Sequence, residues 1–157
     1  MYPKVFLIGL LTIFLGASAL FFFTNSSYQD SIQARVFYFL EDYDLAYELS
    51  KKAYEKDVYN KMAFTVYTQS KIALKFVEYI NQGNEYLKKI DAISEQEEVS
   101  EADRSRIKLM SEVMIESYFE LSPSSLTDKK LVKKAKTMQE RFVSLYKELF
   151  PDSKHLQ

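Results

Sequence analysis

Hydrophobic side chains are distributed unevenly along the chain, and the first feature is an unbroken apolar run near the amino terminus. This run, VFLIGLLTIFLGASALFFF at residues 5 to 23, contains no charged side chain. At about 1.5 Å of rise per helical residue it spans roughly 28 Å, close to the roughly 30 Å hydrocarbon core of a bilayer. The pattern predicts a membrane-spanning helix within residues 1–24.

A cleaved signal peptide is the alternative for the same segment. Lys4 gives a short basic start, and Ala17-Ser18-Ala19 fits the small-x-small cleavage pattern. Cleavage after Ala19 would leave residues 20–23, which are all apolar, at the start of a soluble chain. This continuation favours an uncleaved anchor, and cleavage stays open as the second interpretation.

The charges that flank the apolar run predict its orientation. Lys4 and the amino terminus are positive on the short side, whereas the segment that follows has Asp30 and no cation before Arg35. The positive-inside tendency therefore places the amino terminus in the cytoplasm and the rest of the chain outside it. In a bacterium this means a single-pass inner-membrane protein with a periplasmic domain at residues 25–151.

After residue 24 the apolar positions recur at helical spacing, and polar residues that favour N-caps precede several of these runs. Asp42, Asn60 and Ser100 are the predicted caps, and Gly83 lies where a left-handed C-terminal cap is expected. Residues 152–157 are expected to form a disordered tail. Helices are predicted over residues 28–40, 42–57, 60–83, 84–93, 100–121 and 126–150.

The scarcity of chain breakers favours an all-α fold. The chain has three glycines and three prolines, too few for the turns of a β-rich domain. We expect the membrane helix to be followed by about six helices in three antiparallel hairpins. Apolar stripes with spacings of 3 and 4 would also suit a coiled-coil dimer, but each stripe lasts only about three heptads, which favours burial against neighbouring hairpins.

Small residues recur in the stretch LEDYDLAYELSKKAYEKD and just before it. Ala46 and Ala53 are seven residues apart and return to nearly the same helix face, and Ala34 lies in the preceding predicted helix. Helix axes about 8–10 Å apart leave little space for a large side chain where they cross. We therefore expect Ala34, Ala46 and Ala53 to lie at helix crossings.

These alanines, together with the turn Glu41-Asp42-Tyr43-Asp44, make residues 27 to 60 resemble a tetratricopeptide repeat. That family pairs two antiparallel helices in about 34 residues, with small residues at the crossings. Glu41 stands where the family often has glycine. The resemblance implies a short α-solenoid that holds peptides or helices of partner proteins, a role that is seldom enzymatic. A helical bundle with alanines at its crossings is the alternative.

Two groups of residues are candidates for partner binding. Such repeats usually bind through the first helix of each pair, and tyrosine is common at interface hot spots, so the resemblance points to Tyr38 and Tyr67. In the last predicted helix Lys129, Lys133 and Lys136 form one strip that avoids the apolar seam. An acidic partner, lipid headgroups, the acidic residues at 95–103 and plain solvent are the alternatives for this strip.

The composition argues against catalysis. The chain has no cysteine and one histidine, His155, and its net charge of −1 gives no reason to expect nucleic acid as a partner. Phosphate-loop, serine-hydrolase and zinc-protease motifs are absent from the sequence. The acidic residues at 95–103 lack the ligand pattern of a calcium loop. We expect no enzyme activity, no cofactor and no metal.

The sequence therefore predicts a membrane-anchored scaffold or chaperone-like factor that docks another cell-envelope protein. Such a protein would help to assemble or stabilise a membrane complex, for example a flagellar motor, a secretion system or the division machinery. The alternative is a small accessory subunit that acts mainly through its membrane helix, with the helical domain as a spacer.

Overall fold

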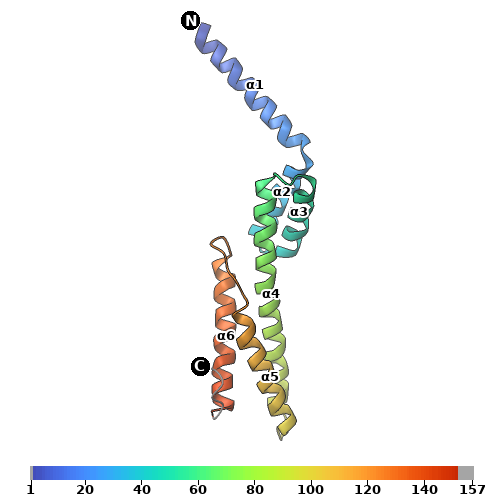
Figure 1. Cartoon of the computed structure of the whole chain (residues 1–157), viewed down its shortest axis with the longest axis vertical. Helices are drawn as coiled ribbons and strands as arrows, with labels where there is room; N and C mark the ends of the chain where they lie inside the picture. Colours follow the sequence, from blue (N-terminus) through green and yellow to red (C-terminus); the bar gives the residue numbers. More distant parts are fainter. Residues whose placement is uncertain (1, 152–157) are drawn as a thin grey trace. The chain divides into compact units, whose positions relative to one another are not determined.

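The computed structural model describes residues 2–151, apart from the side chains of residues 2, 3, 22 and 23, and the predicted tail at 152–157 and His155 lie outside these residues. The described residues form six α-helices and no strand (Figure 1). The prediction of an all-helical chain with one apolar amino-terminal helix is thereby confirmed. The helices are α1 (Tyr2–Thr24), α2 (Ser26–Phe39), α3 (Tyr43–Lys56), α4 (Lys61–Ser94), α5 (Glu101–Tyr118) and α6 (Lys129–Leu149).

The chain divides into two compact units, Met1–Lys71 and Ile72–Gln157, and the division falls within α4. Unit 1 contains α1, α2, α3 and the first part of α4. Unit 2 contains the rest of α4 with α5 and α6. Each unit has its own buried residues, and each is described by itself below.

In unit 1, α2 and α3 run antiparallel across a short turn. Ser27 near the start of α2 contacts Ala53 near the end of α3, and the rings of Tyr38 and Tyr43 lie 5.4 Å apart next to the turn. The predicted cap Asp42 accepts a hydrogen bond from the backbone N–H of Leu45 at 3.2 Å. A polar side chain that satisfies the first free N–H groups explains why α3 begins here.

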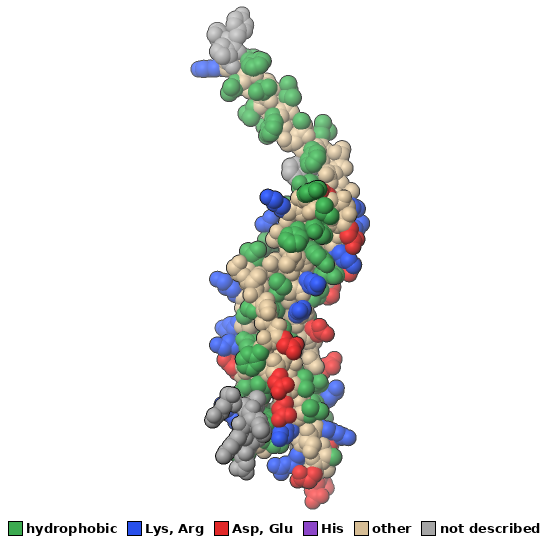
Figure 2. All heavy atoms as spheres, viewed as in Figure 1, with side chains coloured by type: hydrophobic (Ala, Val, Ile, Leu, Met, Phe, Trp, Pro, Cys, Tyr) green, Lys and Arg blue, Asp and Glu red, His purple; other side chains and the backbone are tan. Residues whose placement is uncertain are grey.

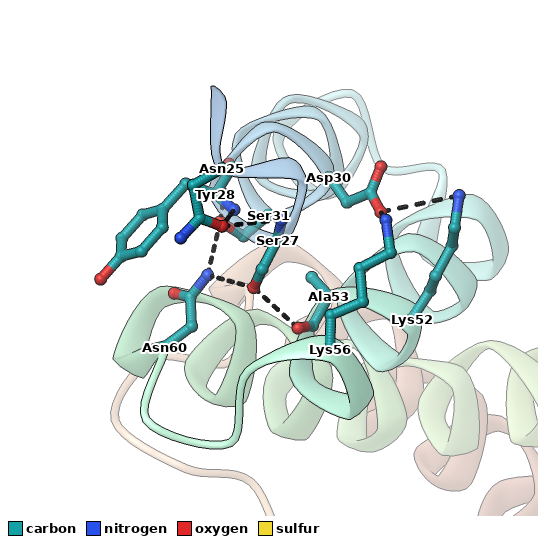
Figure 3. A network of polar contacts seen from close by, with 9 residues as sticks. All are labelled: Asn25, Ser27, Tyr28, Asp30, Ser31, Lys52, Ala53, Lys56 and Asn60. Atoms are coloured by element: carbon teal, nitrogen blue, oxygen red, sulfur yellow. Dashed lines mark hydrogen bonds and ion pairs between the residues drawn. The ribbon is translucent and has the colours of Figure 1, made fainter. Parts of the chain in front are cut away.

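A buried polar network joins three helix ends in unit 1 (Figure 3). Asn60 caps α4, because its Oδ1 accepts from the backbone N–H groups of Met62 and Ala63, both at 3.1 Å. Its Nδ2 donates to Ser27 Oγ at 2.9 Å and to Ser31 Oγ at 3.3 Å. Ser27 Oγ in turn donates to the Ala53 carbonyl at 2.8 Å. One side chain therefore links the start of α2, the end of α3 and the start of α4.

In unit 2, the carboxyl-terminal part of α4 packs with α5 and α6. The Tyr79 hydroxyl of α4 donates to the Met114 carbonyl of α5 at 2.9 Å, and the Tyr146 hydroxyl of α6 donates to Glu112 Oε1 of α5 at 2.9 Å. Both rings are buried. The largest other apolar side chains of this core are Phe76, Ile90, Ile107, Met114, Ile115, Leu131, Met138 and Phe142.

The predicted cap of α5 is also present. Ser100 Oγ accepts from the Asp103 backbone N–H at 3.1 Å and donates to the Asp103 carboxylate at 2.6 Å. This hydrogen bond from the Ser100 hydroxyl lowers the pKa of the Asp103 carboxyl, with a smaller contribution from nearby Arg106. The serine and aspartate therefore stabilise the first turn of α5 reciprocally, as in a capping box.

The predicted break at Gly83 is wrong. Residues 60–83 and 84–93 were expected to form two helices, but α4 continues as one helix of 34 residues through Asn81-Gln82-Gly83-Asn84. Gly83 has no positive φ, so it is not a left-handed cap. A Cβ at this position would lie 2.7 Å from Met138 Cγ and Sδ, which shows that glycine serves close packing here. Within residues 2–151, five helices, and not six in three hairpins, therefore follow α1.

Candidate functional site

Helix α1 is apolar and exposed. Its window Lys4–Phe21 has a mean hydropathy of 2.1, and none of this window is buried within the structure. Among the described residues this is the one helix long and apolar enough to cross a membrane, although a signal sequence has the same properties. Figure 2 shows hydrophobic side chains along α1, whereas charged side chains are frequent on the other helices.

Helix α2 exposes several large apolar side chains on one side. The side toward α3 and α4 is built from small residues: Ser27, Ser31 and Ala34 are all buried. The opposite side carries large apolar residues at spacings of four, three and one, which place them on one helix face. This apolar face of α2 consists of Ile32, Val36 and Phe39 in the helix and Leu40 at its C-cap, exposed by 47%, 52%, 71% and 68%.

The apolar face of α2 continues from α1. Only Asn25 separates the two helices, and its side chain caps α2 by accepting from the backbone of Ser27 at 3.0 Å. The rings of Phe21 in α1 and Tyr28 in α2 meet edge to face at 5.7 Å. Tyr28 precedes Ile32 by one helical turn, so apolar side chains extend from the end of α1 along the outer face of α2.

The three alanines expected at helix crossings are all completely buried. Ala34 and Ala46 lie in one cluster with Val66 of α4, and half-buried Phe37 and Leu49 pack against this cluster. The carbonyl of Ala53 accepts the hydrogen bond from Ser27.

The two candidate tyrosines lie in different aromatic clusters, and each is half-buried. Tyr38 contacts the rings of Phe39 and Tyr43 at 6.4 Å and 5.4 Å. Tyr67 stacks on Tyr54 at 6.1 Å and lies 5.3 Å from Tyr47, and a hydrogen bond with Tyr67 raises the pKa of Tyr47. The structure therefore does not bring Tyr38 and Tyr67 together into one surface.

A groove between α4 and α6 lies in unit 2 and has a volume of about 470 Å³. Met138 is buried and Ile80 is half-buried, and the charged side chains around them are exposed. The described residues that line the groove carry four cations and no carboxylate. They are Ile80, Asn84, Lys130, Lys133, Lys134, Thr137, Met138 and Arg141.

Only one lysine of the predicted strip lines this groove. Lys133 lines it, whereas Lys129 and Lys136 lie outside the lining. Lys136 instead approaches Glu140 on its own helix at 3.8 Å. Sequence reasoning missed Arg141, one helical turn beyond Thr137, because no apolar pattern on α6 shows which polar residues border a neighbouring helix.

Other clusters of charge are mixed or dispersed. A second groove of about 270 Å³ in unit 2 is bordered by Lys75 but also by Glu78 and Glu120, so opposite charges offset each other. Asp30 of α2 pairs with Lys56 and Lys52 of α3 at 2.7 Å and 3.6 Å, as Figure 3 shows. Within residues 2–151 there is no group of three or more His, Cys, Asp or Glu side chains that could hold a metal ion.

Comparisons of the chain with known protein families, with curated proteins and with solved structures find no match. The arguments about function below therefore rest on the residues and geometry described above.

Proposed function

We propose that this protein is a membrane-anchored interaction module that docks another cell-envelope protein and helps to assemble or stabilise a membrane complex. Helix α1 holds it in the inner membrane, with the amino terminus in the cytoplasm and the helical units in the periplasm. The units act as a small scaffold of the helical-hairpin kind that the tetratricopeptide-like stretch implies, and the protein performs no catalysis.

The observation that carries this proposal is the orientation of α2. A helix of a soluble domain normally buries its large apolar side chains, because each buried leucine- or isoleucine-sized group contributes about 1.5–3 kcal/mol. Here the fully buried residues are serine and alanine and Phe37 is half-buried, whereas Ile32, Val36, Phe39 and Leu40 are exposed on one face. A contiguous exposed apolar face of this kind is typical of an interaction site.

The occupant we propose for the apolar face of α2 is an apolar helix of a partner that crosses the same bilayer. The face begins next to α1 through the contact between Phe21 and Tyr28, and only Asn25 intervenes between the helices. A partner with its own membrane helix would therefore meet this face where it leaves the bilayer. Side chains spaced by one helical turn on both partners would interdigitate, as in the packing of one helix on another.

Site-specific cross-linking in intact cells tests the proposal. A photoreactive residue at Val36 is expected to cross-link to an apolar segment of a membrane protein, identified by mass spectrometry of the joined peptides. The same residue at Glu55, which is exposed on α3, serves as the matched control and is expected to give no such product. The double variant Ile32→Ser/Phe39→Ser should abolish the product.

Two results would contradict the proposal. Cross-links from Val36 to phospholipid alone would mean that this face lies on the bilayer. Cross-links that persist unchanged in the Ile32→Ser/Phe39→Ser variant would mean that the apolar face does not hold the partner. In both cases α1 could still be a membrane anchor.

A second candidate function uses α1 itself as the contact, with the helical units as a spacer. It is favoured by Gly9 and Gly16, which are seven residues apart on one helix face, because a Cβ added to either would meet nothing within 4 Å in the described part of the chain. Replacing residues 5–23 by an unrelated membrane helix separates the two functions. Assembly of the membrane complex that survives the replacement supports docking through α2, and loss of assembly supports docking through α1.

A further inference from the structure

The groove between α4 and α6 combines an apolar floor with a one-sided charge. Met138 and Ile80 provide apolar surface, and Lys130, Lys133, Lys134 and Arg141 are exposed around it. Because the lining residues include no acidic side chain, the lining as a whole is positively charged. Charge complementarity therefore favours an anionic occupant.

The spacing of the polar side chains narrows the choice of occupant. Lys130, Lys134, Thr137 and Arg141 follow each other at spacings of four, three and four, so they form one row along α6. At about 1.5 Å per residue, this row is roughly 16 Å long. A single phosphate or carboxylate group reaches only one part of such a row. A second helix repeats its side chains at the same pitch and can present an acidic group to each cation in turn.

The apolar floor adds a second requirement. A groove of about 470 Å³ has room for one or two large side chains from a partner. Methionine is flexible and polarisable, so Met138 can adapt to different apolar anchors. Arg141 can bind a carboxylate through two parallel hydrogen bonds, and Asn84 and Thr137 offer uncharged hydrogen-bonding groups.

We infer that this groove binds an acidic amphipathic helix of a partner protein, with its carboxylates along Lys134 and Arg141 and its apolar side chains between Ile80 and Met138. The inference is independent of the proposed docking through α2, because the groove lies entirely in unit 2 and the apolar face of α2 lies in unit 1. Failure of either one leaves the other standing.

The test uses the full chain in micelles of a neutral detergent. The probe is a fluorescent synthetic helix with glutamates at spacings of four, three and four along one edge and leucines beside them, and its binding is followed by anisotropy. A matched peptide with glutamine in place of each glutamate is expected to bind about tenfold more weakly or worse. Binding of the acidic peptide should also weaken as the salt concentration rises.

Two matched variants of α6 separate the groove from the general charge of the helix. Lys134→Glu/Arg141→Glu should weaken binding of the acidic peptide by about tenfold or more, because both attractions become repulsions. Lys129→Glu/Lys136→Glu changes the net charge equally at two residues outside the groove lining and should alter binding by less than about twofold. All four side chains are exposed. The neutral variant Lys134→Gln/Arg141→Gln should weaken binding of the acidic peptide by an intermediate amount.

Several outcomes would overturn the inference. Equal weakening by the two charge-reversal pairs would show attraction to net charge and no specific groove. Vesicles containing phosphatidylglycerol that displace the acidic peptide would indicate a lipid site, and displacement by inorganic phosphate at low concentration would indicate a small-anion site. Failure of the acidic peptide to bind the unchanged protein would overturn it directly.

Discussion

Met138 of α6 lies directly against Gly83 of α4. A Cβ on Gly83 would be 2.7 Å from both Cγ and Sδ of Met138 and 3.0 Å from Cε of Met114. Both methionines are buried, so neither can move into solvent to make room. The glycine therefore lets α4 and α6 approach more closely than any other residue would allow.

Gly83→Ala is accordingly expected to destabilise unit 2, although alanine favours a helix by about 1 kcal/mol over glycine. Overpacking of a filled core costs about 1–3 kcal/mol, so we expect a net loss of about 1 kcal/mol in the free energy of unfolding. Chemical denaturation of the full chain in detergent measures it. Asn81→Ala, at an exposed position of the same helix, is the control, and a gain in stability for Gly83→Ala would contradict the packing argument.

Glu41 in the turn between α2 and α3 has a φ of 64°, the left-handed region that favours glycine. For a residue with a Cβ this conformation costs about 1–2 kcal/mol, and glycine also loses more backbone entropy on folding. We expect Glu41→Gly to raise the free energy of unfolding by about 0.5–1 kcal/mol. Leu40→Gly is the matched control. Because Leu40 has a φ of −81°, glycine at this position should lower the free energy of unfolding.

Asn60 caps α4 and also binds Ser27 and Ser31. Asn60→Ala removes both functions, and we expect it to lower the free energy of unfolding by about 2–3 kcal/mol. Asn60→Asp keeps an oxygen for the cap but removes the Nδ2 donor. It should therefore lower the free energy of unfolding by less than Asn60→Ala does, but measurably. Hydrogen exchange at the amino-terminal amides of α2 and α4 distinguishes the two. Equal exchange in Asn60→Asp and the unchanged protein would mean that the network contributes nothing beyond the cap.

Tyr79 provides a prediction about alkaline pH. Burial, and secondarily the nearby Tyr118, raise the pKa of the Tyr79 hydroxyl well above its usual value of 10.0. Below pH 10 the hydroxyl is neutral in both the folded and unfolded chain, and its contribution to stability is complete. As the pH rises above 10 the unfolded chain ionises first, so this contribution is lost progressively toward the folded-state pKa.

Tyr79→Phe should therefore reduce the loss of stability between neutral and strongly alkaline pH, while costing about 1 kcal/mol at neutral pH through the missing hydrogen bond to Met114. Thermal unfolding followed by circular dichroism at several pH values measures both effects. Tyr59→Phe is the control, because Tyr59 is 88% exposed. An alkaline profile for Tyr79→Phe that matches the control would contradict the assignment.

The proposed membrane orientation is tested by chemical labelling, which the absence of cysteine from the natural chain makes simple. Glu55→Cys introduces one exposed thiol on α3. We expect a maleimide that cannot cross the inner membrane to label it in cells whose outer membrane has been permeabilised. Labelling that requires lysis of the inner membrane would place the helical units in the cytoplasm.

Local chemistry made much of the fold predictable. The apolar run in α1 and the caps Asp42, Asn60 and Ser100 depend on neighbouring residues along the chain, so the sequence reveals them directly. Ala34, Ala46 and Ala53 are completely buried, and their place at helix crossings stays a prediction. Their relation to a repeat family stays a prediction, because it depends on how successive hairpins are arranged.

The sequence by itself determined that the chain is helical, where most helices begin, and that its first segment is apolar enough to enter a membrane, because these properties depend on residues within a few turns of one another. Tertiary structure alone decided three further features: that α4 passes unbroken through Gly83, that α2 exposes Val36 and Phe39, and that Lys134 and Arg141 border one groove. The physical reason is that packing between distant segments contributes more free energy than a local turn or helix preference. Which face a helix buries is therefore set by the side chains opposite it, such as Met138 facing Gly83.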